Sequence, residues 1–234
     1  MQYVRLGYRQ RVVYLARVKG GVGATTLALN LAWRVSEKAK VLLIDTRAAI
    51  LGFLVCSDVL DILGVEPFEQ SEWETPRVLQ LSDNLYFLPY PSTHEKYDLD
   101  RVVLEARRDY DAIIVDLPPL IATDDTLKSA SAVVFLYGGG ASEGRRLLRL
   151  INHCRTQYQK EAVYVSTVHQ PLLNLHKEGE NSDWIHLPRG RIKGGIFDAK
   201  DLAGRAITEI IREVWGKDLE SEKQGFFARM FRGS

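Results

Sequence analysis

A glycine-rich segment near the N-terminus carries the residues with the clearest chemical meaning. Its residues are Lys19, Gly20, Gly21, Val22, Gly23, Ala24, Thr25 and Thr26. A turn of this kind lets backbone N–H groups surround a phosphate, and a helix that starts there adds a favourable dipole. The phosphate-loop pattern G-x-x-x-x-G-K-[ST] is nearly present, but Ala24 stands at the lysine position. The motif taken alone leaves open a purely structural turn.

Two carboxylates follow apolar runs farther along the chain. Asp45 lies near the end of the run 40–46, and Asp116 near the end of the run 111–117. An acidic residue at the C-terminal end of a strand beside a phosphate-binding loop is placed to hold Mg²⁺, directly or through water. The two aspartates therefore support a phosphate and metal site more strongly than the glycine-rich turn alone.

Short β-branched runs that alternate with helical segments must position these residues. This alternation predicts an α/β fold with a doubly wound, mainly parallel sheet that carries helices on both faces. The expected helices include one that follows the glycine-rich turn and one that starts at Ser142 as N-cap. We expect strands at 12–18, 40–46, 85–89, 111–117, 131–137 and 162–168.

The composition is that of a globular chain with no general affinity for nucleic acid. The 234 residues are 46% hydrophobic and 26% charged, with a formal net charge of +1. These values exclude a disordered or fibrous chain and a strongly basic one. The two cysteines, Cys56 and Cys154, have no metal-ligand spacing, which favours a reducing compartment. No apolar run is long enough to span a membrane, and we expect a cytoplasmic protein.

The motifs resemble those of the ParA/MinD group of deviant-Walker P-loop ATPases. The matching residues are K-G-G-V-G-x-T-T, then V-L-L-I-D, then I-I-V-D-L-P. The resemblance implies ATP and Mg²⁺ as cofactors, with Thr25 as a metal ligand and Asp116 as the Walker B carboxylate. It also implies a homodimer in which Lys19 reaches the phosphates held by the partner. Within the group, G-G-V-G-A-T-T is similar to the CpaE/TadZ branch, which helps to place pilus and secretion machinery.

Three departures from the family pattern bear on catalysis and on base recognition. Ala24 lacks the charge that neutralises phosphate oxygens, and Arg47 stands where the family has the carboxylate that orients the attacking water. The family's Asn-Arg pair for adenine is also missing near 165–169. We therefore expect little or no hydrolysis. A protein that retains the fold as an interaction module, without nucleotide, is the alternative.

The last residues form a candidate membrane-targeting tail. In a helix, the apolar side chains share one face and the basic ones flank it. This tail resembles the C-terminal membrane helix of MinD, although it could instead dock on the protein's own core. We divide the chain into a P-loop domain (1–216), a charged linker (217–224) and the tail (225–234). The tail residues expected to contact lipid are Phe226, Phe227, Arg229, Met230, Phe231 and Arg232.

These observations predict a positioning or assembly factor for pilus or secretion machinery. It would be a homodimer, peripheral at the inner face of the cell membrane, that contacts anionic lipid through the tail and a protein partner of a localisation or assembly machine. We do not expect DNA to be a partner. Two other functions stay open, namely an active ATPase that partitions DNA or another cargo, and a nucleotide-independent scaffold.

Overall fold

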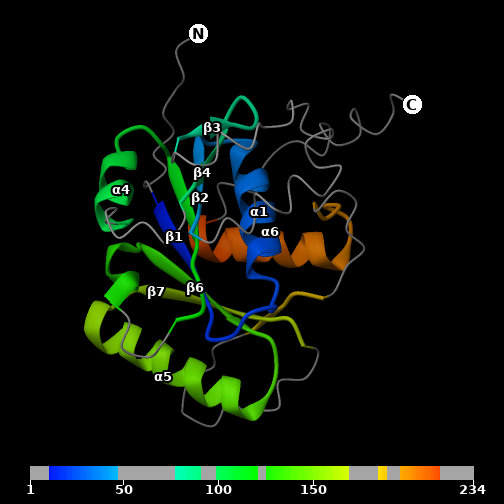
Figure 1. Cartoon of the computed structure of the whole chain (residues 1–234). Helices are drawn as coiled ribbons and strands as arrows, with labels where there is room; N and C mark the ends of the chain where they lie inside the picture. The colour runs from blue at the N-terminus through cyan, green and yellow to red at the C-terminus, as the bar shows by residue number, and fades with distance from the viewer. Residues whose placement is uncertain are drawn as a thin grey trace.

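A single sheet organises the part of the chain that the structure describes. The computed structural model describes residues 11–46, 77–90, 99–120, 125–168, 184–188 and 196–216. Eight strands lie in the order β3-β4-β2-β5-β1-β6-β7-β8 (Figure 1). Their bounds are β1 Arg11–Ala16, β2 Val41–Asp45, β3 Leu79–Gln80, β4 Leu85–Pro89, β5 Ala112–Asp116, β6 Ala132–Tyr137, β7 Glu161–Ser166 and β8 Ile185–His186.

The strand pairing confirms the predicted doubly wound, mainly parallel sheet. Every pair of neighbours in this sheet is parallel except β3 with β4. The six expected strands are all present, with ends that differ by at most two residues. The two-residue strands β3 and β8, at the sheet edges, were not predicted, because two residues are too few to show a hydrophobic period.

Helices cover both faces of the sheet, and each face has its own apolar core. Side chains of α1 (Ala24–Ser36) and α6 (Leu202–Trp215) pack on one face. The 3₁₀ helix η2 (Asp125–Ser129) and the helices α4 (Leu99–Ala106) and α5 (Ala141–Tyr158) pack on the other (Figure 1). In β1, Val13 and Leu15 point to the first core, whereas Val12 and Tyr14 point to the second. This two-sided burial explains the nearly continuous apolar runs of the central strands.

The predicted N-cap of α5 at Ser142 is wrong. The helix begins one residue before it, at Ala141, and its N-cap is Gly140, which has a φ of 103° and makes no side-chain cap hydrogen bond. Gly139 also has a positive φ, so two successive glycines turn the chain from β6 into the helix. The Glu143 carboxylate accepts a hydrogen bond from the Gly138 N–H at 2.6 Å and joins the helix to this turn.

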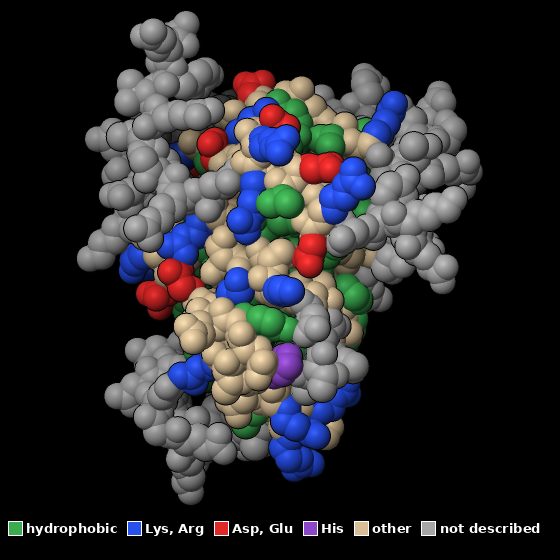
Figure 2. Space-filling model, turned by 90° about the vertical axis from the view of Figure 1, so that its left-hand side faces the viewer, with side chains coloured by type: hydrophobic (Ala, Val, Ile, Leu, Met, Phe, Trp, Pro, Cys, Tyr) green, Lys and Arg blue, Asp and Glu red, His purple; other side chains and the backbone are tan. Residues whose placement is uncertain are grey.

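Charges of both signs are mixed on the side of the molecule that carries α4 and α5. Figure 2 shows Lys and Arg side chains interspersed with Asp and Glu there, with hydrophobic side chains exposed only in small separate areas among the described residues. None of the described helices is long and apolar enough to cross a membrane. Arg47, the linker 217–224 and the tail 225–234 lie outside the described residues.

Candidate functional site

The glycine-rich segment forms the turn between β1 and α1, as the sequence predicts. Gly21 and Gly23 have φ values of 74° and 83°, in the left-handed region that favours glycine. A Cβ atom built on Gly20 or Gly21 would meet no atom within 4 Å, so packing does not explain the absence of side chains there. The turn therefore combines a backbone that needs glycine with open space beside it.

The N-terminus of α1 offers backbone donors to a ligand. Gly23 is its N-cap and makes no side-chain cap hydrogen bond, and the first turn contains no acidic residue. The first N–H groups of a helix have no partner within the helix, and an anion stabilises them. Together with the open glycine turn, this arrangement fits a phosphate group. We therefore find a geometric basis for the predicted nucleotide-binding residues, whose role in binding stays a prediction.

The residues of the turn differ in exposure. Lys19 is exposed, as a residue that reaches a second copy of the chain must be. Thr25 and Thr26 are partly exposed. Ala24 is only 2% exposed and belongs to the core between α1 and the sheet, so its methyl group also has a packing role. Val22 is buried against the turn after β6, where a Cβ on Gly138 would lie 2.4 Å from Val22 Cγ1.

The two aspartates lie side by side at the carboxyl edge of the sheet. Asp45 of β2 pairs in register with Asp116 of β5, and Leu15 of β1 is in register with Asp116 on the other side. Both aspartates are completely buried. The order β2-β5-β1 therefore places Asp116 directly beside the strand that leads into the glycine-rich turn.

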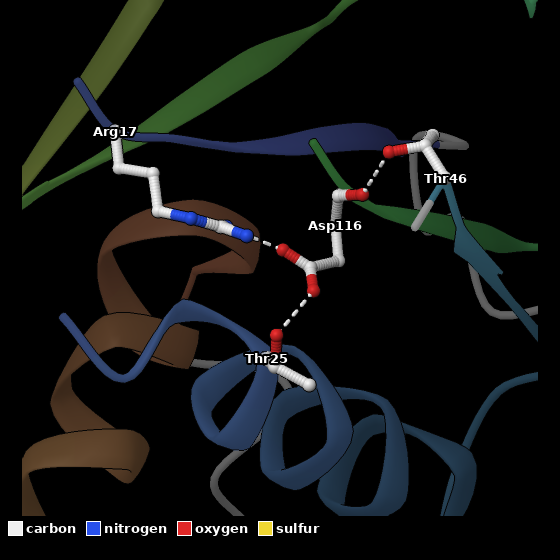
Figure 3. A network of polar contacts seen from close by, with 4 residues as sticks. All are labelled: Arg17, Thr25, Thr46 and Asp116. Carbon is white, nitrogen blue, oxygen red and sulfur yellow. Dashed lines mark hydrogen bonds and ion pairs between the residues drawn. The ribbon is translucent and has the colours of Figure 1, made fainter. Parts of the chain in front are cut away.

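Asp116 is held by donors from α1 and from the residues that directly follow β1 and β2, as Figure 3 shows. Arg17 Nη1 lies 2.5 Å from Asp116 Oδ1, and the Thr25 hydroxyl donates to Asp116 Oδ2 at 2.7 Å. The backbone carbonyl of Asp116 accepts from the Thr46 hydroxyl at 2.6 Å and from the Thr46 N–H at 3.2 Å. The Leu120 N–H donates to the Arg17 carbonyl at 2.7 Å, so Arg17 also holds the chain that leaves β5.

This arrangement bears directly on the Mg²⁺ site predicted at Thr25, Asp45 and Asp116. The hydrogen bond from Thr25 to Asp116 is compatible with a metal, because the hydroxyl oxygen keeps lone pairs while it donates its proton. The guanidinium of Arg17 is not compatible with a metal, because its positive charge already pairs with the carboxylate that would attract the ion. As arranged, these residues do not fit a divalent ion.

The sequence reasoning missed Arg17, Thr46 and Glu143. Arg17 is the one charged residue inside the otherwise apolar segment 12–18, and a charge in a strand that is to be buried indicates a buried partner. Glu143 is 5% exposed, and its Oε2 has no hydrogen-bond partner among the residues that the structure describes. Burial of Tyr137, followed by the Glu143 charge, raises the pKa of the Tyr137 hydroxyl. Thr46 and Glu143 gave no such signal, since their hydrogen-bond partners are backbone groups.

A comparison with protein families decides the assignment of the chain. Residues 10–132, more than half of the chain, match the family model of the cellulose biosynthesis protein BcsQ. The chain belongs to the BcsQ family. The matched region runs from the start of β1 to the start of β6 and so includes the glycine-rich turn and both aspartates.

Solved structures confirm that this BcsQ-family chain has the fold of ParA and MinD proteins. MinD from Pyrococcus horikoshii, complexed with Mg-ADP, is 16% identical with a TM-score of 0.63, over 87% of this chain and 95% of that one. A plasmid partition protein from Borrelia burgdorferi bound to AMPPNP is 20% identical with a TM-score of 0.61, over 87% and 98%. Cobyrinic acid a,c-diamide synthase from Mycobacterium smegmatis, with an ATP analog and magnesium, is 18% identical with a TM-score of 0.58, over 87% and 94%. The curated protein sequences gave no significant match.

Proposed function

We propose that the chain is a nucleotide-binding positioning or assembly factor for a secretion machine at the cell envelope. The observation that carries the proposal is the turn between β1 and α1, where Gly21 and Gly23 take left-handed conformations beside open space at an uncapped helix N-terminus. Such a turn presents several N–H groups to one anion. The structural neighbours hold ADP, AMPPNP or an ATP analog, which supports ATP as the ligand.

The family assignment supports cellulose export as the process. The BcsQ family is named for cellulose biosynthesis. The motif also resembles the CpaE/TadZ branch, which helps to place pilus and secretion machinery. Both processes need an assembly at a defined place in the envelope. We propose that the chain serves the machine that makes cellulose. Evidence for a role in a pilus or another secretion machine would change this assignment.

Assembly as a homodimer is part of the proposal. Lys19 is exposed at the start of the turn, whereas the buried cation on Asp116 is Arg17. An exposed lysine beside a phosphate-binding turn is available to the phosphates of a facing copy, and two copies in this arrangement would follow a two-fold axis. The tail 225–234 would then appear twice, and two weak lipid contacts would act together through their effective concentration.

A matched pair of glycine substitutions tests nucleotide binding. Gly21 and Gly216 both have a positive φ, and a Cβ on either would meet no atom within 4 Å, but Gly216 follows α6. Both Gly21→Ala and Gly216→Ala strain the backbone, yet only the first alters the turn. Calorimetric titration with ATP should show affinity at least about tenfold weaker for Gly21→Ala and nearly unchanged for Gly216→Ala. Equal losses, or no binding by the unaltered chain, would contradict the proposed site.

The same pair tests the process in cells. A strain that carries Gly21→Ala should export less cellulose than a strain with Gly216→Ala, as measured by the fluorescence of a cellulose-binding dye. A fluorescent fusion of the unaltered chain should form foci at the envelope that the Gly21→Ala fusion loses. Normal cellulose export with a loss of pili would assign the chain to pilus assembly instead.

A further inference from the structure

We propose that Arg17 supplies, from within the chain, the positive charge that a divalent cation would otherwise place beside Asp116. The phosphate-bearing ligand then binds at the glycine-rich turn without Mg²⁺. This inference rests on the proposed function, because it concerns the ligand of that same turn. It departs from the Mg²⁺ site that the sequence predicts at Thr25, Asp45 and Asp116.

The first argument is the position of the guanidinium. Arg17 follows β1 directly, and its Nη1 lies 2.5 Å from Asp116 Oδ1 at the end of the neighbouring strand β5. The other carboxylate oxygen, Oδ2, accepts the hydrogen bond of the Thr25 hydroxyl at 2.7 Å. Figure 3 shows the Arg17 and Thr25 side chains reaching Asp116 from different directions. A cation and a neutral donor of the chain itself thus engage both oxygens.

The second argument is the cost of replacing Arg17 with an ion. The Arg17 side chain is 3% exposed and Asp116 is 0% exposed, so the pair lies in the interior of the protein. A metal that took over the Asp116 carboxylate would leave a buried guanidinium without its counter-charge, which is strongly unfavourable. Arg17 is also fixed through its backbone, since its carbonyl accepts the Leu120 N–H. A movement of the backbone at Arg17 therefore cannot easily take the guanidinium away from Asp116.

The third argument is the charge that an arriving phosphate meets. Without a cation, the Asp116 carboxylate would repel a phosphate anion at the N-terminus of α1, where Thr25 lies. The Arg17–Asp116 pair is neutral as a unit, so this repulsion is removed before any metal binds. The N–H groups of the turn then face the anion with the Asp116 charge already compensated.

A purely structural ion pair is the alternative, and the requirement for metal separates the two. If Arg17 replaces the cation, ATP should bind the unaltered protein with nearly the same affinity in EDTA and in MgCl₂. The ratio should stay below about threefold, whereas coupled sites usually differ by roughly 5- to 150-fold. If the unaltered protein binds ATP at least about tenfold more tightly with Mg²⁺, the proposal is overturned, whatever the variants do.

Three substitutions sharpen this titration. Arg17→Gln should raise the Mg²⁺ to EDTA affinity ratio above about tenfold, because Asp116 then needs an external cation. Arg17→Lys keeps the charge and should keep the ratio low. Arg11→Gln is the matched control, because Arg11 starts the same strand and forms an ion pair with Glu161 away from the turn. A ratio that stays low in Arg17→Gln would overturn the proposal.

A measurement without nucleotide separates this inference from the proposed function. The melting temperature of the unaltered protein should not change when MgCl₂ is added, whereas that of Arg17→Gln should rise by about 2–4 °C as the ion compensates Asp116. If the unaltered protein binds no ATP but shows this pattern, the proposed function fails and the charge replacement stands. If MgCl₂ stabilises both proteins equally, or stabilises neither of them, the proposal that Arg17 replaces the cation fails.

Discussion

Arg17 Nη1 lies 2.5 Å from Asp116 Oδ1, although the two residues are 99 positions apart and almost completely buried. β1 and β5 are neighbours in the sheet and both end at this point, so their side chains meet at one edge. A buried pair of this kind adds little net stability as a whole, but the loss of one member leaves an uncompensated charge.

Removal of the Asp116 charge should therefore destabilise the protein more than removal of its neutral donor. We expect Asp116→Asn to lower the free energy of unfolding by about 3–5 kcal/mol, since Arg17 then lacks its counter-charge. Thr25→Val, which removes one hydrogen bond to the carboxylate, should cost about 1–3 kcal/mol. Urea unfolding measures both. Glu161→Gln, which breaks the more exposed pair with Arg11, is the control and should cost less than about 1 kcal/mol.

ATP turnover should be close to background even when partner and lipid are present. Ala24 lacks the phosphate-neutralising charge, and Arg47 cannot act as the carboxylate that orients water. Ala24→Lys should strengthen ATP binding more than it raises the rate, because Arg47 is unchanged. Phosphate release and calorimetric titration measure the two effects. Partner-stimulated turnover that disappears in Asp116→Ala would refute this expectation.

Ala24→Lys should also lower the melting temperature in the absence of ATP. The Ala24 methyl group is 2% exposed in the core beneath α1, and a lysine there must either bury its ammonium or displace the turn. ATP should then raise the melting temperature of Ala24→Lys more than that of the unaltered chain, because the phosphates pair with the new charge. Differential scanning fluorimetry with and without ATP shows the comparison. An equal ATP shift in both proteins would place position 24 away from the phosphates.

The turn after β6 should be sensitive to a single methyl group. A Cβ on Gly138 would lie 2.4 Å from Val22 Cγ1, so Gly138→Ala forces Val22 and the glycine-rich turn to move. We expect Gly138→Ala to lower stability by about 1–3 kcal/mol and to weaken ATP binding. Val22→Ala in the same chain should recover part of both losses, which a double-mutant cycle measures. If Val22→Ala makes the defect worse, contact between these two residues is not its cause.

The tail should bind anionic lipid through its apolar side chains. Phe227→Glu with Phe231→Glu should abolish co-sedimentation with anionic vesicles, because charges replace the face expected to enter the interface. The domain should keep its melting temperature. Leu104→Glu with Leu202→Glu adds the same charge at two side chains that are 65% and 72% exposed on the domain, and should leave lipid binding in place. Loss of stability in the tail variant would mean that the tail packs on the domain.

Alkaline pH should destabilise the protein partly through Cys154. Burial raises the pKa of this thiol, and the Lys160 charge offsets only part of the effect. A group whose pKa is higher in the folded state contributes stability that is complete below its unfolded pKa and is lost as the pH rises through the folded value. The loss should start above about pH 8.5, and Cys154→Ala should reduce it. Urea midpoints at neutral and alkaline pH measure the slope, and equal slopes in both proteins would exclude this thiol as a cause.

Much of the fold could be predicted because the signals were local. Runs such as that in β2, which is buried along its whole length, are too apolar for an exposed position, and their alternation with helical periods leaves few topologies. The edge strands and the start of α5 could not be predicted in the same way. Ser142 has the right side chain for a cap, but the conformations of Gly139 and Gly140 start the helix one residue earlier.

The sequence by itself determined the glycine-rich turn, because left-handed backbone conformations at Gly21 and Gly23 need residues without a Cβ. It also predicted the six longer strands and that Asp45 and Asp116 lie near the ends of two of them. Only the tertiary structure decided what those aspartates contact, since a carboxylate oxygen can coordinate a metal or accept a hydrogen bond from a hydroxyl or a guanidinium. The order β2-β5-β1 brought Arg17 to Asp116, and that order depends on packing between strands that are distant in the chain.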